Sequence, residues 1–272
     1  MSIKNFFLIL LLPLIFSCNK PKDSFEAIVP SPDSKIHVYF NLNKGEPYYL
    51  VYYNKEIVID WSSLGFILKD NDSLIDGFVL AARKTRSVNE IRDTVLGDFF
   101  SFKSKYNELT ISLQQEGALG RKFDIVFRVF NNGIGFRYVF PEQEGLTNVE
   151  IVSEETEFRL GSDCIAWWIP ADSIGYERFY RNTSFKEIET LNTPVTFELK
   201  NGLYISIHEA NPTDYARLTL KRDEEDELEF DCYLVPFPDG IKVKTKTPFK
   251  TPWRIILIVS DPEKLIESGL MQ

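Results

Sequence analysis

Residues 201–215 read NGLYISIHEANPTDY. Asn201 and Gly202 both tolerate a positive φ, so this pair predicts a tight hairpin turn. After the turn, apolar residues alternate with polar ones, which is the period of a β-strand with one apolar face. The same alternation places Glu209 on the apolar face at the far end of the strand. Because an unpaired buried carboxylate costs several kcal/mol, we expect a cationic group to meet Glu209.

The strand that carries Glu209 is expected to end at Asn211-Pro212, because proline lacks the amide donor that a β-ladder needs. Glu209 therefore lies where a strand gives way to a loop. Ligand-binding side chains are common at such positions. Glu209 is the first candidate for a functional group.

The rest of the chain from residue 25 repeats this pattern of short alternating runs separated by turn residues. Strands are predicted at 36–40, 48–53, 57–59, 64–68, 78–85, 98–103, 109–113, 124–130, 135–140, 218–221, 228–235, 241–247 and 253–259. Strands at a spacing of about 8–12 residues are typical of a sandwich or barrel. Since 14% of the 272 residues are aromatic and helical periodicity is rare, we expect a single all-β domain.

The alternating pattern is interrupted between residues 160 and 193. Residues 164–170, CIAWWIP, read as a short buried run, and residues 171–192 read as a long loop rich in aromatic side chains. Trp167, Trp168 and Tyr176 have flat rings that suit the C–H faces of a sugar. Core packing or a domain interface is the alternative interpretation of the Trp pair.

The charge of the chain limits the classes of ligand. Its formal net charge is -9, which argues against nucleic acid because nucleic-acid binding relies on neutralising phosphates. The charge is compatible with a secreted domain, a metal site or a neutral substrate such as a sugar. The acidic run 224–227 is predicted to be a solvated hairpin tip, since neighbouring carboxylates on a strand point to opposite faces.

The N-terminus has the pattern of an export signal over residues 1–17. Lys4 is followed by an apolar run of eleven residues, 6–16, which is too short to span a bilayer. The residues before Cys18 resemble the lipobox of bacterial lipoproteins, so we expect Cys18 to be acylated and residues 18–24 to form a tether. A plain secretory signal with an incidental cysteine is the alternative. Cys164 and Cys232 are expected to be buried free thiols, although an oxidising compartment would permit a pair.

Most catalytic motifs are absent from the sequence. There is no HExxH, CxxC, GxSxG or glycine-rich phosphate loop, and the two histidines, His37 and His208, lie far apart. Nucleophilic triad chemistry is therefore unsupported. Paired carboxylates, as used in glycoside hydrolysis, remain open. The candidates are Asp172, Glu177, Glu209 and Asp214.

Several long motifs resemble the N-terminal domain of glycoside hydrolase family 97, in one register from about residue 31 to residue 258. They read SPDSKIHVYFNLNKGEPYYLVYYNKEIVI, SSLGFILKD, YNELTISLQQ, KFDIVFRVFNNGIGFRYVFPEQ, AWWIPAD, NTPVTFELKNGLYISIHEA and HEANPTDY. This family consists of calcium-dependent α-glucosidases and α-galactosidases of the Bacteroidetes type, secreted or lipid-anchored. The resemblance implies a β-supersandwich of the galactose mutarotase type. In the family, this domain is followed by a (β/α)8 barrel that carries the catalytic carboxylates. A small β domain then completes the chain.

The resemblance implies a role for Glu209. The glutamate of the HEA motif is the one calcium ligand that the N-terminal domain contributes in this family, and the barrel supplies the others. His208, Asn211 and Asp214 then become candidates for orienting Glu209 or contacting sugar, with ordinary turn chemistry as the alternative. The β domain is expected over residues 25–260. Residues 261–272 are expected to start a linker to the barrel, with a short helix from residue 260 to 267.

Three functions are consistent with these features. The first is the non-catalytic N-terminal domain of a family 97 hydrolase, in a truncated or split chain. We expect this domain to be inactive by itself because the barrel carboxylates have no counterpart here. The second is a stand-alone carbohydrate-binding lipoprotein, and the third is a mutarotase-like enzyme, which two distant histidines support poorly. In the first two, the partner is an α-linked oligosaccharide or polysaccharide, and the location is the periplasm or outer membrane.

Overall fold

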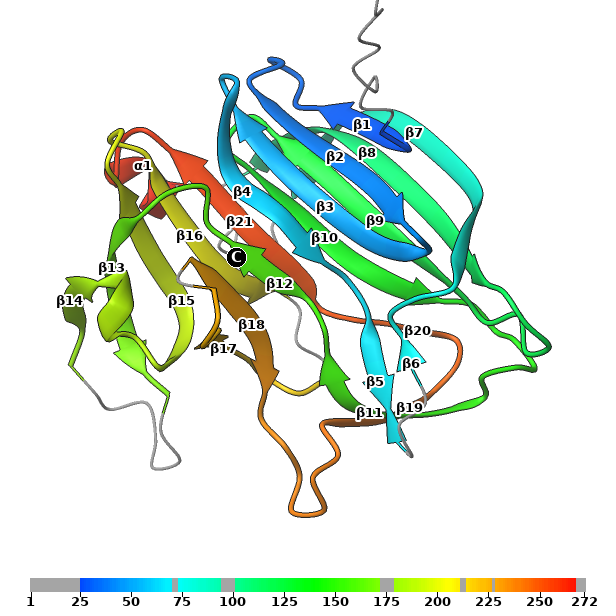
Figure 1. Cartoon of the computed structure of the whole chain (residues 1–272). Helices are drawn as coiled ribbons and strands as arrows, with labels where there is room; N and C mark the ends of the chain where they lie inside the picture. Colours follow the sequence, from blue (N-terminus) through cyan, green and yellow to red (C-terminus); the bar gives the residue numbers. More distant parts are fainter. Residues whose placement is uncertain are drawn as a thin grey trace, which may run out of the picture.

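The structure is a computed structural model that describes residues 25–69, 73–93, 101–171, 179–210, 214–226 and 228–267. The described residues form almost entirely β-strands in antiparallel sheets, so the predicted all-β class is confirmed (Figure 1). Several sequence predictions lie outside the described ranges. They concern the export signal and tether, Cys18, Asp172, Tyr176, Glu177 and Asn211.

The first sheet contains four antiparallel strands in sequence order. They are β1 (Ala27–Pro30), β2 (Ile36–Asn43), β3 (Glu46–Tyr53) and β4 (Glu56–Ser63). Burial along β2 alternates, with Ile36, Val38 and Phe40 buried and the residues between them half-buried. One face of this sheet therefore packs on the core and the other faces outward, as strand periodicity requires.

The main sheet has the strand order β12-β18-β17-β15-β16-β21-β10-β9-β8-β7, with β13, β14 and β20 attached beside this path. Its strands are β7 (Phe78–Asp93), β8 (Ser101–Gln115), β9 (Lys122–Phe130), β10 (Gly133–Phe140), β12 (Glu157–Arg159), β13 (Cys164–Pro170), β14 (Arg181–Ser184), β15 (Thr190–Leu199), β16 (Tyr204–Ala210), β17 (Leu218–Arg222), β18 (Glu229–Leu234), β20 (Phe249–Lys250) and β21 (Trp253–Val259). A third sheet has the order β19-β11-β5-β6. Its strands are β5 (Phe66–Leu68), β6 (Ser73–Leu74), β11 (Asn148–Glu154) and β19 (Val243–Lys246).

The first sheet lies over the β7–β9 end of the main sheet (Figure 1). Aromatic side chains pack between the layers. The Tyr49 ring of the first sheet lies 5.0 Å from the Phe136 ring of the main sheet. The Phe66 ring of the third sheet lies 4.6 Å from the Tyr138 ring of the main sheet. Each fully buried aromatic side chain contributes on the order of 1.5–3 kcal/mol. A single backbone bridge between Ile59 and Leu160 continues the first sheet from β4 toward β12.

The largest difference from the predicted strands lies in the β7–β8 hairpin. The predicted strand 109–113 and the described part of the predicted strand 98–103 belong to one strand, β8, and the strand predicted at 78–85 continues to Asp93. The ladder between β7 and β8 runs from the Phe78–Gln115 pair to the Asp93–Ser101 pair. Residues 81–87 of this hairpin are all exposed, so the sequence there has no alternation of apolar and polar residues from which a strand could be predicted.

The predicted loop at 171–192 is also partly wrong. Within it, β14 pairs with β13, and the buried Phe185 starts a short 3-10 turn, Phe185–Glu187. The Phe185 ring lies 4.6 Å from the Phe230 ring, so this segment is packed onto the main sheet. Cys164 and Cys232 are buried free thiols, as expected.

Two predicted turns and the C-terminal helix are confirmed. Gly202 adopts φ +82° in the hairpin between β15 and β16. The described residues of the acidic run, 224–226, lie in the connection between β17 and β18. Helix α1 (Glu263–Glu267) begins after Asp261, whose side chain accepts a hydrogen bond from the Glu263 amide at 3.1 Å. No helix of the described ranges has the length and apolar character of a membrane span.

Candidate functional site

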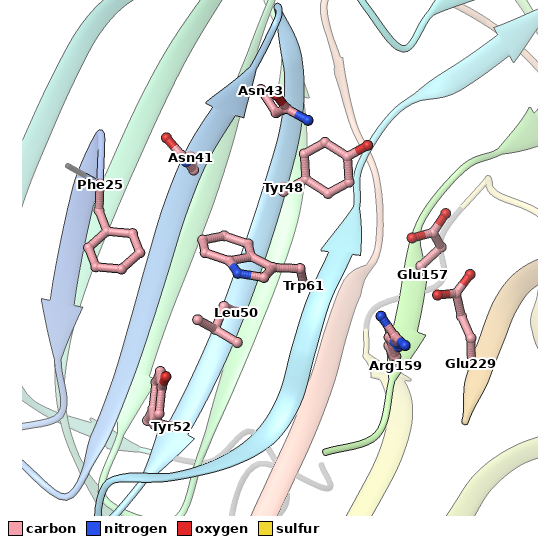
Figure 2. A pocket seen from close by; sticks show the side chains of 10 residues that line it. All are labelled: Phe25, Asn41, Asn43, Tyr48, Leu50, Tyr52, Trp61, Glu157, Arg159 and Glu229. Atoms are coloured by element: carbon pink, nitrogen blue, oxygen red, sulfur yellow. The ribbon is translucent and has the colours of Figure 1, made fainter. Parts of the chain in front are cut away.

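A cavity of about 870 Å³ opens on the outward face of the first sheet (Figure 2). Its floor comes from β2, β3 and β4, and one wall comes from β12 and β18. The lining residues are Phe25, Asn41, Asn43, Tyr48, Leu50, Tyr52, Trp61, Glu157, Arg159 and Glu229. Its size is in the range of small-ligand sites in proteins.

Carboxylates crowd the β12–β18 wall of this cavity. Glu157 and Asp231 are paired directly across the two strands, and Glu229 is paired with Arg159. The ligand atoms of Glu157, Glu229 and Asp231 lie within 4.8 Å of one another. Arg159 forms its ion pair with Asp226 at 2.8 Å. Burial, together with the neighbouring negative charges, raises the pKa of Glu229 to about 8 and the pKa of Asp231 to about 6.

These raised pKa values predict a pH-dependent stability. The pKa of Glu229 is higher in the folded state than its ordinary value of 4.5. The protonated side chain therefore stabilises the fold fully below about pH 4.5, and this stabilisation is lost as the pH rises through about 8. We therefore expect Glu229→Gln to be more stable than the wild type at about pH 8 and nearly equal to it at about pH 4. Urea unfolding of both proteins at the two pH values measures this difference. A difference that does not change between them contradicts the prediction.

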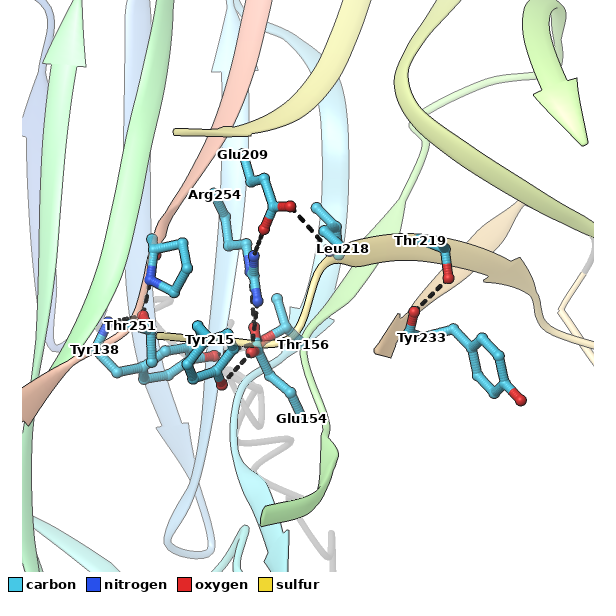
Figure 3. Close-up of polar contacts among 11 residues, drawn as sticks. Tyr138, Glu154, Thr156, Glu209, Tyr215, Leu218, Thr219, Tyr233, Thr251 and Arg254 are labelled. Atoms are coloured by element: carbon cyan, nitrogen blue, oxygen red, sulfur yellow. Dashed lines mark hydrogen bonds and ion pairs between the residues drawn. The ribbon is translucent and has the colours of Figure 1, made fainter. Parts of the chain in front are cut away.

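The second polar region surrounds Glu209 at the end of β16 (Figure 3). The Glu209 Oε2 atom accepts a hydrogen bond from Arg254 Nη1 at 2.9 Å, and Oε1 accepts one from the Leu218 amide at 3.1 Å. The Glu209 side chain is 10% exposed and the Arg254 side chain 0%. β16 and β21 place Glu209 and Arg254 directly opposite each other. The expected cationic partner of Glu209 is therefore present, and it is an arginine.

Arg254 is shared with a second carboxylate, Glu154 at the end of β11. Arg254 Nε and Nη2 donate to the two Glu154 oxygens at 2.9 and 2.7 Å. Tyr215 Oη donates to Glu154 Oε2 at 2.7 Å, and Thr156 Oγ1 donates to Oε1 at 3.1 Å. Burial by itself would raise the pKa of Glu154, but the charge and hydrogen bonds of Arg254 hold it below its ordinary value.

The charges of this group do not cancel. Burial opposes the charge of Arg254, but Glu154 raises the pKa of Arg254 well above its usual range, so the pair stays ionised. Two carboxylates, Glu154 and Glu209, share one guanidinium, that of Arg254, so the group has one formal negative charge in excess. Of the three side chains, Glu209 is the one that solvent reaches. Each carboxylate oxygen has two lone-pair positions, so the oxygens of Glu209 retain capacity for another ligand. This arrangement fits a cation bound at Glu209.

The other candidate site residues are dispersed. His208 is buried within β16, and Asp214 is exposed in a turn at φ +53°. The two tryptophans of β13 face opposite ways, with Trp167 45% exposed and Trp168 2% exposed. Trp168 Nε1 donates to Thr183 Oγ1 at 3.1 Å, so this ring belongs to the core. Of these residues, His208 is the sequence neighbour of Glu209.

A family profile described as Glycosyl-hydrolase 97 N-terminal matches residues 29–272. The chain belongs to glycoside hydrolase family 97. A family 97 enzyme from Pseudoalteromonas sp. strain K8, solved in complex with panose, superposes with a TM-score of 0.85 and 33% identity, over 90% of this chain and 37% of that one. The same enzyme solved with acarbose gives the same values. A β-arabinopyranosidase structure, at TM-score 0.76 and 22% identity over 86% of this chain and 40% of that one, shares the fold.

A probable retaining α-galactosidase of Streptomyces bingchenggensis (strain BCW-1) is 27% identical over 219 residues, which is 78% of this chain and 31% of that protein. The chain therefore spans about a third of the length of these family 97 relatives and of the curated one.

Sequence reasoning did not identify Arg254, Glu154 or the cavity of this family 97 domain. Arg254 left a visible signal, because it is the one charged residue in the strand WRIILIV, which is buried at every position. Glu154 and the cavity left none. The cavity lining comes from two segments, residues 25–61 and residues 157–229, that lie far apart in the sequence.

Proposed function

We propose that this chain is the non-catalytic N-terminal domain of a calcium-dependent glycoside hydrolase, where it braces a catalytic barrel and supplies Glu209 as one calcium ligand. The observation that supports the metal role is the excess negative charge at Glu209, which Arg254 and the Leu218 amide hold in one orientation. The substrate would be an α-linked glucoside or galactoside. The relatives that support this class are a probable retaining α-galactosidase and an enzyme solved with panose and acarbose.

One carboxylate makes an incomplete calcium site. Calcium takes six to eight oxygen ligands, and in the described ranges Glu209 does not belong to any group of three or more potential metal ligands. The remaining ligands would come from the barrel. When bound, the ion would supply a positive charge that polarises substrate oxygens. The residues of this chain, Arg254 and the Leu218 amide, would hold Glu209 in place.

This proposal predicts weak calcium binding by the 272-residue chain, with a dissociation constant at or above about 1 mM. Isothermal titration calorimetry of the wild type and Glu209→Gln measures it, with Glu189→Gln as the matched control at an exposed glutamate. Micromolar binding that Glu209→Gln abolishes would show a site completed within the chain. The chain is also expected not to cleave nitrophenyl α-glucosides or α-galactosides, so turnover above the Glu209→Gln background would contradict the non-catalytic role.

We also propose that the protein is an exported lipoprotein of the periplasm or outer membrane, held to the membrane by acylation of Cys18. The apolar run before Cys18 and the polar residues after it support this assignment. A lipid of this kind anchors a protein without a spanning helix.

The alternative function is a stand-alone carbohydrate-binding domain. It is favoured by the exposed aromatic side chains of Trp167, Phe179 and Tyr180 beside β13 and β14. Exposed apolar patches usually mark interaction sites. A surface that packs against a barrel has the same character, so sugar binding that Trp167→Ala abolishes would support the alternative.

A further inference from the structure

Aromatic rings line the cavity on the first sheet and contact a further ring, that of Tyr39, beside it. The rings of Phe25 and Trp61 are stacked, with centroids 6.0 Å apart and planes inclined by 28°. Tyr39 contacts Phe25 edge-on at 4.7 Å and Tyr52 at 5.2 Å. These four rings hold one another in place although they belong to different strands or their flanks. Outward positions of a sheet are ordinarily polar, so this concentration of rings is unusual.

Polar groups stand at the wall beside this floor. Figure 2 shows the carboxylates of Glu157 and Glu229 next to each other, with Arg159 below them and Trp61 between them and Phe25. Glu157 Oε2 accepts a hydrogen bond from the Ser63 amide at 2.7 Å, which fixes its carboxylate in position. Asn41 and Asn43 contribute amide groups from β2. Fixed polar groups beside flat apolar surfaces are characteristic of specific small-ligand sites.

The lining excludes several classes of ligand. An anion would lie beside the carboxyl groups of Glu157, Glu229 and Asp231, where the raised pKa of Glu229 shows that further negative charge is unfavourable. A wholly apolar ligand would strip these carboxylates of water without replacing their hydrogen bonds. A small organic cation needs rings on several sides, whereas Phe25 and Trp61 are stacked on each other and form one platform. The guanidinium of Arg159 also lies on the lining.

We propose that this cavity binds a neutral oligosaccharide, with Trp61 as the stacking surface for a sugar ring. The C–H face of a pyranose packs on an aromatic ring, and its hydroxyl groups donate to carboxylates and accept from amide or guanidinium groups. Glu157 and Glu229 are the acceptors for the hydroxyls, and Arg159 and Asn41 are the donors. This site is built from strands other than β16 and does not depend on calcium at Glu209.

The test is calorimetric titration of the 272-residue chain with maltotriose and with raffinose, in the presence of a chelator so that calcium has no part in the result. We expect at least one of these sugars to bind with a dissociation constant of about 0.1–10 mM. Trp61→Ala is expected to weaken binding about tenfold or more. Trp167→Ala, which removes the exposed tryptophan of β13, is the matched control and is expected to bind as the wild type does.

Glu229→Gln is a second test variant, which remains informative if Trp61→Ala fails to fold. It removes a carboxyl group that neighbouring carboxylates disfavour in its charged form. It is expected to remain folded and to bind several-fold more weakly. The proposal is overturned if neither sugar binds, if binding is unchanged in both Trp61→Ala and Glu229→Gln, or if Trp167→Ala abolishes it. Binding of tetramethylammonium at this cavity without binding of either sugar also overturns it.

Discussion

Replacement of Arg254 by methionine is expected to lower the free energy of unfolding by about 3–5 kcal/mol. The substitution keeps an unbranched side chain in β21 but removes the cation that binds Glu154 through two hydrogen bonds. Glu154 is fully buried, so its carboxylate would be left without an opposite charge or would have to take up a proton. Guanidinium chloride unfolding of the wild type and the variant at neutral pH measures the loss.

Two further variants identify the cause of that loss. Glu209→Gln removes a carboxylate that is partly exposed and keeps Arg254 paired with Glu154, so it is expected to cost less. The double variant Arg254→Met, Glu154→Leu removes both members of the buried pair and is expected to recover most of the loss. If the free energy of unfolding of Arg254→Met is within about 1 kcal/mol of the wild-type value, the Arg254–Glu154 pair does not stabilise the fold as predicted.

Gly161→Ala is expected to destabilise the protein by about 3 kcal/mol or more. Gly161 follows the Ile59–Leu160 bridge that joins β4 to β12, and its amide donates to the Val58 carbonyl at 3.2 Å. A Cβ atom at Gly161 would lie 2.1 Å from the carbonyl oxygen of Ile57. Since the contact is with backbone, the seam between β4 and β12 would have to open. Urea unfolding measures the effect.

Gly240→Ala is the matched control for this steric argument. Gly240 has φ +84°, and a Cβ atom there would meet nothing within 4 Å. Its substitution carries only the cost of a left-handed backbone, about 1–2 kcal/mol. A Gly161→Ala variant that is no less stable than Gly240→Ala would contradict the close approach of the two strands. Gly161→Ala is also expected to weaken the binding of a ligand in the cavity, because β12 carries Glu157 and Arg159.

The sequence predicts the strands of this protein well where one face is apolar. β2, β9 and β21 all occur where alternation or an apolar run places them. The prediction fails in two physical situations. Residues 81–87 pair along the β7–β8 hairpin while exposed, so their strand has no apolar face. β16 was expected to have one polar face, yet Ser206 and His208 are buried, opposite Leu257 and Ile255 of the apolar strand β21.

The sequence predicts that Glu209 has a cationic partner, but it does not predict which residue that partner is. A carboxylate at the apolar end of a strand requires a cation, so the need for a partner follows from Glu209 itself. Arg254 supplies it from a strand 45 positions later, and no local pattern specifies which strand becomes the neighbour. The cavity is less predictable still, because its floor and wall come from distant segments that meet across the β4–β12 seam.

The position of β21 has a consequence for how this chain is made. β21 is inserted between β10 and β16, and it pairs with both. Residues 253–259 are therefore synthesised long after the two strands that they join. Until they emerge from the ribosome, β10 and β16 each present an unpaired backbone edge, which is a template for aggregation. The main sheet is completed only when this central strand is available, so a chain that ends upstream of residue 253 is expected to expose both edges and to aggregate.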